Sequence, residues 1–243
     1  MNTKKQGVHD LLMGIQTGDP GAVWAVNETM YKQHNPLTLD QGVGLAELFA
    51  RLSKMNPKVS IVRILHDGDF VCCHTKYSFS RVSVGFEVFR YEEDKIVEHW
   101  DNLQPMEGDK VELVDGMLEG TTEISDLQLT DANRSLVKEM IDNVFIGKQH
   151  ELMSNYIAND NFIDHNILIS LPDKAFRNNF TKTHKLIAEG NFVLVGNEGY
   201  DADGVHSSFF DLFRLEAGKV VEHWDTTEAV PPESEWKNQN GKF

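Results

Sequence analysis

A histidine and an aspartate two residues apart occur twice in this chain, each time within the sequence Val-Glu-His-Trp-Asp. The first copy supplies His99 and Asp101, and the second copy, 124 residues later, supplies His223 and Asp225. In a β-strand, residues i and i+2 face the same side of the sheet. A carboxylate buried in an apolar pocket has a raised pKa and can move protons, while a nearby histidine can donate a hydrogen bond to an enolate. The repeated motif therefore indicates acid–base chemistry.

Each hairpin that leads into this motif carries a further acid. A three-residue loop with Gly218 in the left-handed conformation places Asp211 opposite His223, and the same count places Glu87 opposite His99. Opposite charges on neighbouring strands favour this register. The sequence therefore predicts two clusters, each on one face of a sheet: Glu87, His99 and Asp101 in the first half, and Asp211, His223 and Asp225 in the second.

The similarity between the two halves extends well beyond the motif. The segment GFEVFRYEEDKIVEHWD, which ends at Asp101, matches SFFDLFRLEAGKVVEHWD, which ends at Asp225. Upstream, HDGDFV (66–71) matches AEGNFV (188–193), and YKQHN (31–35) matches FIDHN (162–166). A repeat of about 120 residues has the size of a domain. The sequence therefore predicts two tandem domains, 1–122 and 123–243, joined in a polar stretch rich in Thr and Asp.

Hydrophobic periodicity predicts helices first and strands afterwards in each half. Helical spacing marks Val8–Thr17 and Ala132–Lys148, with shorter helices at 20–31, 43–54, 149–158 and 173–180. Alternating patterns then mark strands at 58–65, 70–77, 82–91 and 95–103, and at 183–188, 192–199, 205–215 and 219–227. The expected fold class is α+β, with helices packed on an antiparallel sheet in each half. The stretch 231–243, PPESEWKNQNGKF, is expected to be ordered and to pack over a neighbouring element.

The net charge of −15 argues against two classes of partner. An acidic chain repels the phosphates of nucleic acid and the surface of an anionic membrane. No stretch approaches the roughly 20 apolar residues of a membrane-spanning helix, and the start of the chain is not typical of a secretory signal. The cysteines Cys72 and Cys73 are adjacent within an expected strand, which suits buried thiols in a reducing cytoplasm.

The order of motifs resembles that of the SnoaL-like polyketide cyclases in the nuclear transport factor 2-like superfamily. The matching segments are YKQHNP (31–36), AEGNFV (188–193), DLFRLEAGKVVEHWD (211–225) and their counterparts in the other half. The resemblance covers nearly the whole chain, once in each half. It implies a cone-like fold, in which a curved sheet and the helices above it enclose a pocket. It also implies pairing of the two domains within the chain, with a homodimer of the chain as a further option.

The resemblance assigns roles to residues of both halves. His34 and His165 would point into the pocket from the helical side and meet the residues of the last strand. In the first half Asp101 would be the base, with His99 and His34 orienting it or stabilising an enolate, and Glu87 would hold His99. In such cyclases an acid moves the proton without a metal or an organic cofactor. The implied reaction is an aldol-type cyclisation, an isomerisation or a related proton transfer on a small, largely apolar carbonyl compound.

The two halves also differ. His74, in VCCHTKY, is a further pocket candidate, and the second half has Gly196 in its place. If a histidine on that strand matters for the chemistry, the second site is altered or inactive.

Two alternatives to catalysis stay open. The clusters could be buried polar networks that stabilise the sheet, or the protein could bind a small ligand or act in assembly without turnover. An open pocket between His34 and Asp101 would favour an enzyme, and solid packing there would favour the alternative. Two histidines and a carboxylate are also ligands for iron or zinc. However, the sequence has no His-x-x-x-His or Cys-x-x-Cys spacing, and paired charges already account for the clusters.

Overall fold

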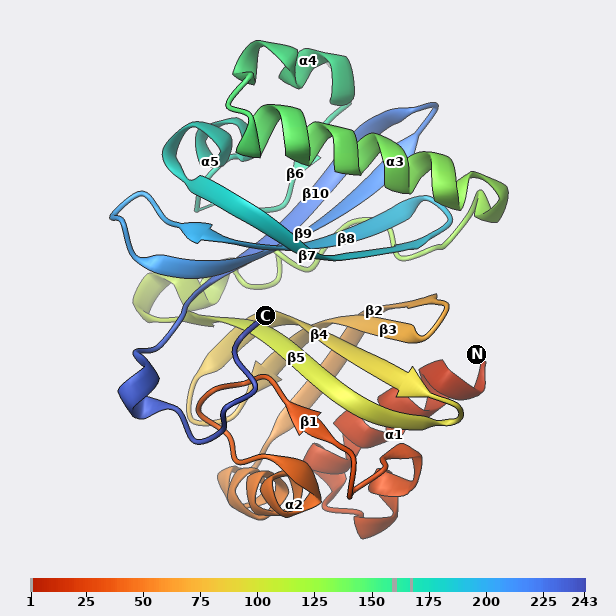
Figure 1. Cartoon of the computed structure of the whole chain (residues 1–243), viewed down its shortest axis with the longest axis vertical. Coiled ribbons are helices and arrows are strands. Elements are labelled where there is room, and N and C mark those ends of the chain that lie inside the picture. Colours follow the sequence, from red (N-terminus) through yellow and green to blue (C-terminus); the bar gives the residue numbers. More distant parts are fainter. Residues whose placement is uncertain (1, 159–160, 167) are drawn as a thin grey trace. The chain divides into compact units, whose positions relative to one another are not determined.

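Two five-stranded sheets, one in each of two units, form the framework of the protein (Figure 1). The computed structural model describes residues 2–158, 161–166 and 168–243. Unit 1 comprises Met1–Val111 and Pro231–Phe243, and unit 2 comprises Glu112–Val230. The strand orders, β1-β5-β4-β3-β2 and β6-β10-β9-β8-β7, correspond position for position. The predicted α+β fold, with helices packed on a curved sheet in each half of the chain, is confirmed.

Unit 1 follows the predicted order of helices and then strands. Its elements are α1 (Thr3–Thr17), β1 (Lys32–Gln33), α2 (Gln41–Leu52), β2 (Lys58–Asp67), β3 (Phe70–Ser78), β4 (Val82–Glu92) and β5 (Lys95–Met106). In unit 2 they are α3 (Thr130–Met140), α4 (Met153–Tyr156), β6 (Ile163–Asp164), α5 (Leu171–Arg177), β7 (Asn179–Glu189), β8 (Phe192–Tyr200), β9 (His206–Glu216) and β10 (Lys219–Ala229). Every helix among the described residues is too short or too polar to span a membrane.

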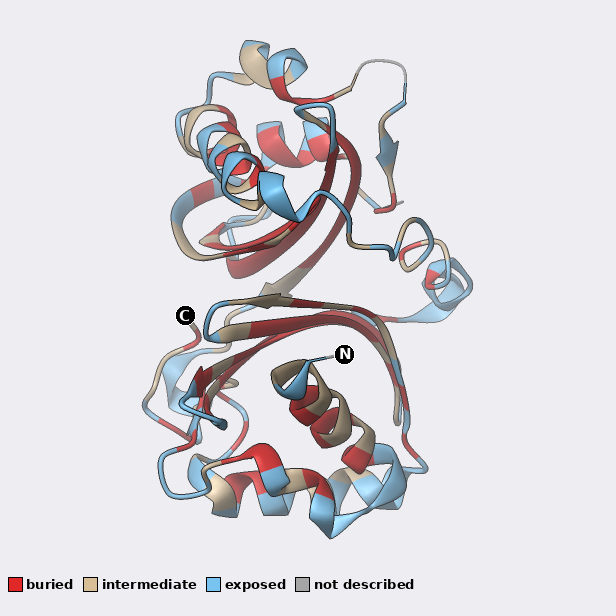
Figure 2. Ribbon diagram, turned by 90° about the vertical axis from the view of Figure 1, so that its right-hand side faces the viewer, coloured by how far each residue is buried: buried red, intermediate tan, exposed pale blue. Residues whose placement is uncertain are grey.

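One face of each sheet is covered by helices and forms the core of its unit. In unit 1 the sheet curves around α1 (Figure 2), whose buried residues at helical spacing include Val8, Leu11 and Leu12. They share a core cluster with Cys73 and Phe89 of the sheet. In unit 2 the equivalent cluster joins the buried side of α3 to β8 and β9. We call this side of each sheet its helix-covered face.

The short strands β1 and β6 were not predicted. Each pairs in parallel with the last strand of its sheet, so that Gln33 lies beside His99 and Asp164 lies beside His223. A two-residue strand has no measurable hydrophobic period, which is why the sequence could not reveal it. These strands bring the QHN and DHN segments next to the repeated motif.

The predicted hairpin register is wrong by two residues. The loop contains two residues, Ala217 and Gly218, both with positive φ, and a bulge follows between Val220 and Glu222. As a result Asp225 lies opposite Asp211, and His223 lies opposite Phe213. In unit 1, Asp101 lies opposite Glu87, and His99 lies opposite Phe89. Because a shift of two residues keeps every side chain on its face, the predicted clusters still form.

Ala217 is strained in this turn, since its φ is 48° and a Cβ in the left-handed region costs about 1 kcal/mol. Replacing Ala217 with Asn creates the Asn-Gly pair that two-residue hairpin loops prefer. We expect Ala217→Asn to raise Tm by about 2 °C, as measured by thermal unfolding followed by circular dichroism. Gly218→Ala is the opposing control and should lower Tm. A lower Tm for Ala217→Asn would contradict this account.

The unit boundary differs from the expected one between residues 122 and 123. Residues 112–122 belong to unit 2, where Thr121 Oγ1 donates a hydrogen bond of 2.7 Å to Glu222 Oε1. Conversely, segment 231–243 belongs to unit 1, although it follows the last strand of unit 2. Each unit is therefore completed by the segment that leaves the sheet of the other.

Candidate functional site

A chain of hydrogen-bonded side chains crosses the helix-covered face of unit 1. Tyr77 on β3 donates its hydroxyl hydrogen to Glu87 Oε1 on β4 at 2.7 Å. Glu87 Oε2 lies 2.5 Å from His99 Nε2 on β5, and His99 Nδ1 lies 2.9 Å from Gln33 Oε1 on β1. The side chains are buried, with 4% of Glu87 and 7% of His99 exposed. The predicted meeting of Glu87 and His99 is confirmed.

Glu87 and His99 share one proton. Gln33 Oε1 also accepts the Asn35 backbone N–H, so it is an acceptor and His99 Nδ1 must carry a hydrogen. Two lone pairs cannot approach to 2.5 Å, so one hydrogen lies between His99 Nε2 and Glu87 Oε2. Burial raises the pKa of Glu87, and the bonds from His99 and Tyr77 offset only part of that rise. A carboxylate whose pKa is raised is a stronger base than an ordinary one.

Asp101 has a different environment from Glu87, its neighbour across the sheet. Asn35 Nδ2 donates a hydrogen bond of 2.6 Å to Asp101 Oδ2. The ammonium group of Lys242, in segment 231–243, lies 3.0 Å from Asp101 Oδ1. Burial alone would raise the pKa of Asp101, but the charges of Lys242 and His99 outweigh burial and lower it. The expected base is therefore an ion-paired carboxylate. Lys242 fills the place where an open pocket was expected, which favours the non-catalytic alternative unless Lys242 leaves.

In unit 2 the equivalent histidine lies between two carboxylates. His223 Nδ1 is 3.0 Å from Asp164 Oδ1, and His223 Nε2 is 3.0 Å from Asp211 Oδ1. Both ring nitrogens must donate, so the imidazole carries a positive charge. Burial opposes that charge, yet Asp164 and Asp211 outweigh it and raise the pKa of His223 to about 10. Where unit 1 has Gln33, unit 2 has Asp164, so the unit 2 histidine has a carboxylate on each side and the unit 1 histidine has only one.

A lysine fills the rest of the unit 2 cluster. Lys174 on α5 lies 2.7 Å from Asp211 Oδ1 and also donates to Asp225 Oδ2. All three side chains are fully buried. Burial alone would lower the pKa of Lys174, but the two aspartates raise it. The predicted group of Asp211, His223 and Asp225 is thus brought together as part of a closed ion-pair network.

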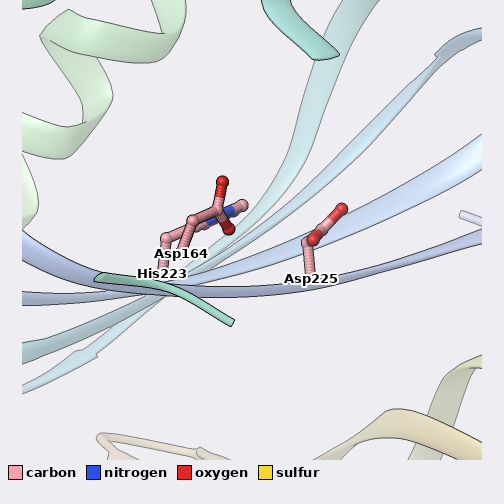
Figure 3. Close-up of side chains that lie close together, drawn as sticks. All are labelled: Asp164, His223 and Asp225. Atoms are coloured by element: carbon pink, nitrogen blue, oxygen red, sulfur yellow. The ribbon is translucent and has the colours of Figure 1, made fainter. Parts of the chain in front are cut away.

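Three members of this network have the residue types of a metal site. The ligand atoms of Asp164, His223 and Asp225 lie within 4.8 Å of one another, and their side chains project from the same side of the sheet (Figure 3). A divalent cation would have to displace Lys174 from Asp225 and remove a proton from His223. Its charge would also be placed beside the buried ammonium group. The donor set therefore fits an ion-pair network better than a metal centre.

His34 and His165 lie outside these clusters, so their expected position in the pocket is wrong. His34 stacks on Trp100, with 4.4 Å between ring centroids, and its Nε2 lies 3.0 Å from Glu98 Oε1. His165 is equivalent, with Trp224 at 4.7 Å and Glu222 at 3.1 Å. Glu98 and Trp100 alternate with His99 and Asp101 along β5, so His34 lies on the opposite face of the sheet.

The pocket assignment of His74 is also wrong. His74 lies opposite Phe86 on the neighbouring strand and stacks on it, with 4.5 Å between ring centroids. Its neighbour Cys73 lies opposite Glu87, so Cys73 and not His74 shares the helix-covered face. His74 Nδ1 lies 3.0 Å from a guanidinium nitrogen of Arg63 on that other face.

The polar residues that complete each cluster were not predicted: Gln33, Asn35, Tyr77 and Lys242 in unit 1, and Asp164 and Lys174 in unit 2. Gln33 and Asn35 flank His34 in the very segment that drew attention to it. Alternation along an extended chain would have placed either His34 or its two neighbours in the pocket. No local signal could reveal Lys242, which lies 141 residues from Asp101 along the chain.

No family profile matches the sequence, and no curated protein is significantly similar to it. Each of the following three solved structures matches less than half of the chain. A candidate polyketide cyclase from Bacillus cereus is 16% identical, covering 42% of this chain and 74% of its own, with a TM-score of 0.38. An NTF2-like protein from Cytophaga hutchinsonii is 16% identical, covering 43% and 92%, with a TM-score of 0.36. An LEH-like epoxide hydrolase from M. tuberculosis is 20% identical, covering 42% and 83%, with a TM-score of 0.37. Over that part of its length, the chain is similar to proteins described as NTF2-like and as polyketide cyclases.

Proposed function

We propose that unit 1 catalyses proton transfer next to the carbonyl group of a small molecule, using only side chains of the protein. The observation that carries this proposal is the 2.5 Å contact between Glu87 Oε2 and His99 Nε2, which places one proton between a buried acid and a base. The proposal agrees with the SnoaL-like resemblance of the sequence, which implies acid–base chemistry in a cyclisation or an isomerisation.

Glu87 suits the role of base better than Asp101 does. Its pKa is raised by burial, whereas the pKa of Asp101 is lowered because Lys242 and His99 outweigh burial. A base is most effective when its pKa is near the working pH. Glu87 therefore takes the proton from the substrate carbon and becomes neutral. The Nε2–H of His99, which faces Glu87 at rest, then donates its hydrogen bond to the enolate oxygen, while Nδ1–H stays on Gln33. Asp101 keeps its negative charge throughout.

For unit 2 the observations favour the alternative of a non-catalytic fold. Its carboxylates are engaged with Lys174 and His223, which are both fully buried. A histidine with a pKa of about 10 is a poor base at neutral pH because it is already protonated. We propose that this cluster stabilises unit 2 and does not turn over a substrate.

The test measures exchange of hydrogen for deuterium in small ketones incubated with the protein in D₂O. We expect the wild-type chain to catalyse exchange at carbons next to the carbonyl, and Glu87→Gln to lower the rate by about 100-fold or more. Glu98→Gln is the matched control, because Glu98 is a half-buried acid near the same position of the sheet but on its opposite face. Its rate should stay close to that of the wild-type chain.

Circular dichroism would establish that both variants are folded. Equal exchange rates for Glu87→Gln and Glu98→Gln would contradict the proposed role of Glu87. Exchange no faster than in buffer, across ketones of different sizes, would contradict proton transfer as the function of unit 1.

A further inference from the structure

Lys242 is a buried cation contributed by a segment with little regular structure. Its side chain is 2% exposed, and its ammonium group pairs with the carboxylate of Asp101. The regular structure of segment 231–243 is limited to one short 3₁₀ turn, Glu233–Glu235. Several contacts that fix the segment are polar: the Asn238 side chain donates to the carbonyl oxygens of Asn35 and Thr38. The buried residues Asn238 and Lys242 are polar as well. Trp236 and Phe243 are half-buried, and no residue of the segment belongs to either core cluster of the described residues. The segment can therefore leave its site without removing a residue from the core.

The same subsite holds a lysine ammonium group in both units. Asp101 and Asp225 are equivalent positions of the repeat, and they bind Lys242 and Lys174 respectively. The two lysines come from unrelated places, since Lys174 lies within α5 and Lys242 lies in the irregular segment. The two units therefore share a buried aspartate at this position, and in each unit a lysine ammonium group forms an ion pair with it.

Charge restricts what can replace Lys242. Asp101 is buried, so removal of Lys242 by a neutral molecule would leave an uncompensated charge in the core. An ammonium-bearing molecule would restore the ion pair and preserve the hydrogen bond from Asn35. A pocket of about 110 Å³ adjoins the segment at Lys237, and its lining includes Leu37 and Thr38.

We infer that Asp101 and Asn35 form a subsite for a primary ammonium group, and that Lys242 occupies this subsite until a ligand displaces segment 231–243. This inference rests on the proposed function in one respect, which is the substrate class. Asp101 lies directly opposite Glu87 across the strands, where side chains are about 5 Å apart. A molecule anchored on Asp101 and reacting at Glu87 therefore carries its ammonium group one or two carbons from the carbonyl, as an amino ketone does.

The experiment removes the lysine side chain and supplies its atoms as a free molecule. Propylammonium chloride contains the three carbons and the nitrogen that Lys242→Ala deletes. We expect Lys242→Ala to have a lower Tm than the wild-type chain, and propylammonium to raise that Tm by about 3 °C or more beyond the effect of equal NaCl. The rise should saturate with concentration, and 1-propanol should not produce it. Lys54→Ala, at an exposed lysine of unit 1, should show no such rise.

The double variant Lys242→Ala/Asp101→Asn identifies the subsite, because it should not respond to propylammonium beyond the NaCl control. A response of Lys242→Ala no larger than that to NaCl, or an equal response of the double variant, would overturn the inference.

A second measurement uses the wild-type chain and does not depend on the folding of a variant. Hydrogen–deuterium exchange of residues 237–243, followed by mass spectrometry, should become several-fold faster with propylammonium than with NaCl. Higher concentrations are needed here, since the tethered lysine competes at an effective millimolar concentration. Unchanged exchange at saturating amine would overturn displacement. Neither readout involves turnover, so a failure of the proposed proton transfer cannot mimic a failure of amine binding.

Discussion

Replacing Lys174 with Met is expected to lower the free energy of unfolding of unit 2 by about 3–5 kcal/mol. The side chain of Lys174 is fully buried and is the ammonium partner of both Asp211 and Asp225. Its removal leaves two buried carboxylates beside one imidazolium. The cluster is already short of donors, since Asp211 Oδ2 and Asp225 Oδ1 accept no hydrogen bond from the described residues. Urea denaturation followed by circular dichroism measures the change.

Two further variants test the cause. Lys138→Met removes an exposed lysine that pairs with Asp142 on the surface of the same unit, and should cost less than about 1 kcal/mol. Adding Asp211→Asn and Asp225→Asn to Lys174→Met removes the uncompensated charges and should recover part of the loss. If Lys174→Met is as stable as Lys138→Met, the network does not stabilise unit 2 in the way proposed.

Raising the pH from 7 to above 10 is expected to destabilise unit 2 by a few kcal/mol. The pKa of His223 is about 10 in the folded chain, against an ordinary value of 6.5. Between these values the folded state binds a proton that the unfolded state does not, and each pKa unit corresponds to about 1.4 kcal/mol. This stabilisation is fully present below pH 6.5 and is lost as the pH rises through 10. Urea midpoints at several pH values measure it.

The variant Asp164→Asn distinguishes the contribution of His223 to the pH dependence from that of other groups that titrate at high pH. This substitution puts a neutral amide beside His223, as Gln33 does beside His99 in unit 1. The pKa of His223 should therefore fall, and the dependence on pH should become weaker than in the wild-type chain. NMR of the imidazole resonances gives the charge directly. A neutral His223 at pH 8 in the wild-type chain would contradict the assignment.

The repeat predicted much of the architecture because hydrophobic patterns are local. Alternation in 82–91 and 95–103 located β4 and β5 to within three residues at each end. The register was wrong because the turn residues Ala217 and Gly218 were read as part of a longer loop, and because a compensating bulge follows them. The motif residues were nevertheless placed on the correct face of the sheet, because side chains along a strand alternate with a period of two residues.

The clusters themselves were only half predicted. Glu87, His99 and Asp101 belong to adjacent strands, so one hairpin determines their proximity. His34 was misplaced because β1 is too short for its inward and outward positions to be told apart. The exchange of segments 112–122 and 231–243 between the units was unexpected for a different reason, since a tandem repeat predicts that each segment stays with its own sheet.

By itself, the sequence determined that the chain contains two α+β domains, and that each presents a histidine and two acids on one face of a sheet. Strand alternation and the repeat suffice for this, because both act over short stretches of chain. Only the tertiary structure decided the charge states of these groups. The pKa of a buried side chain depends on partners that are distant in sequence, here Asp164 beside His223, Lys242 beside Asp101 and Lys174 beside Asp211.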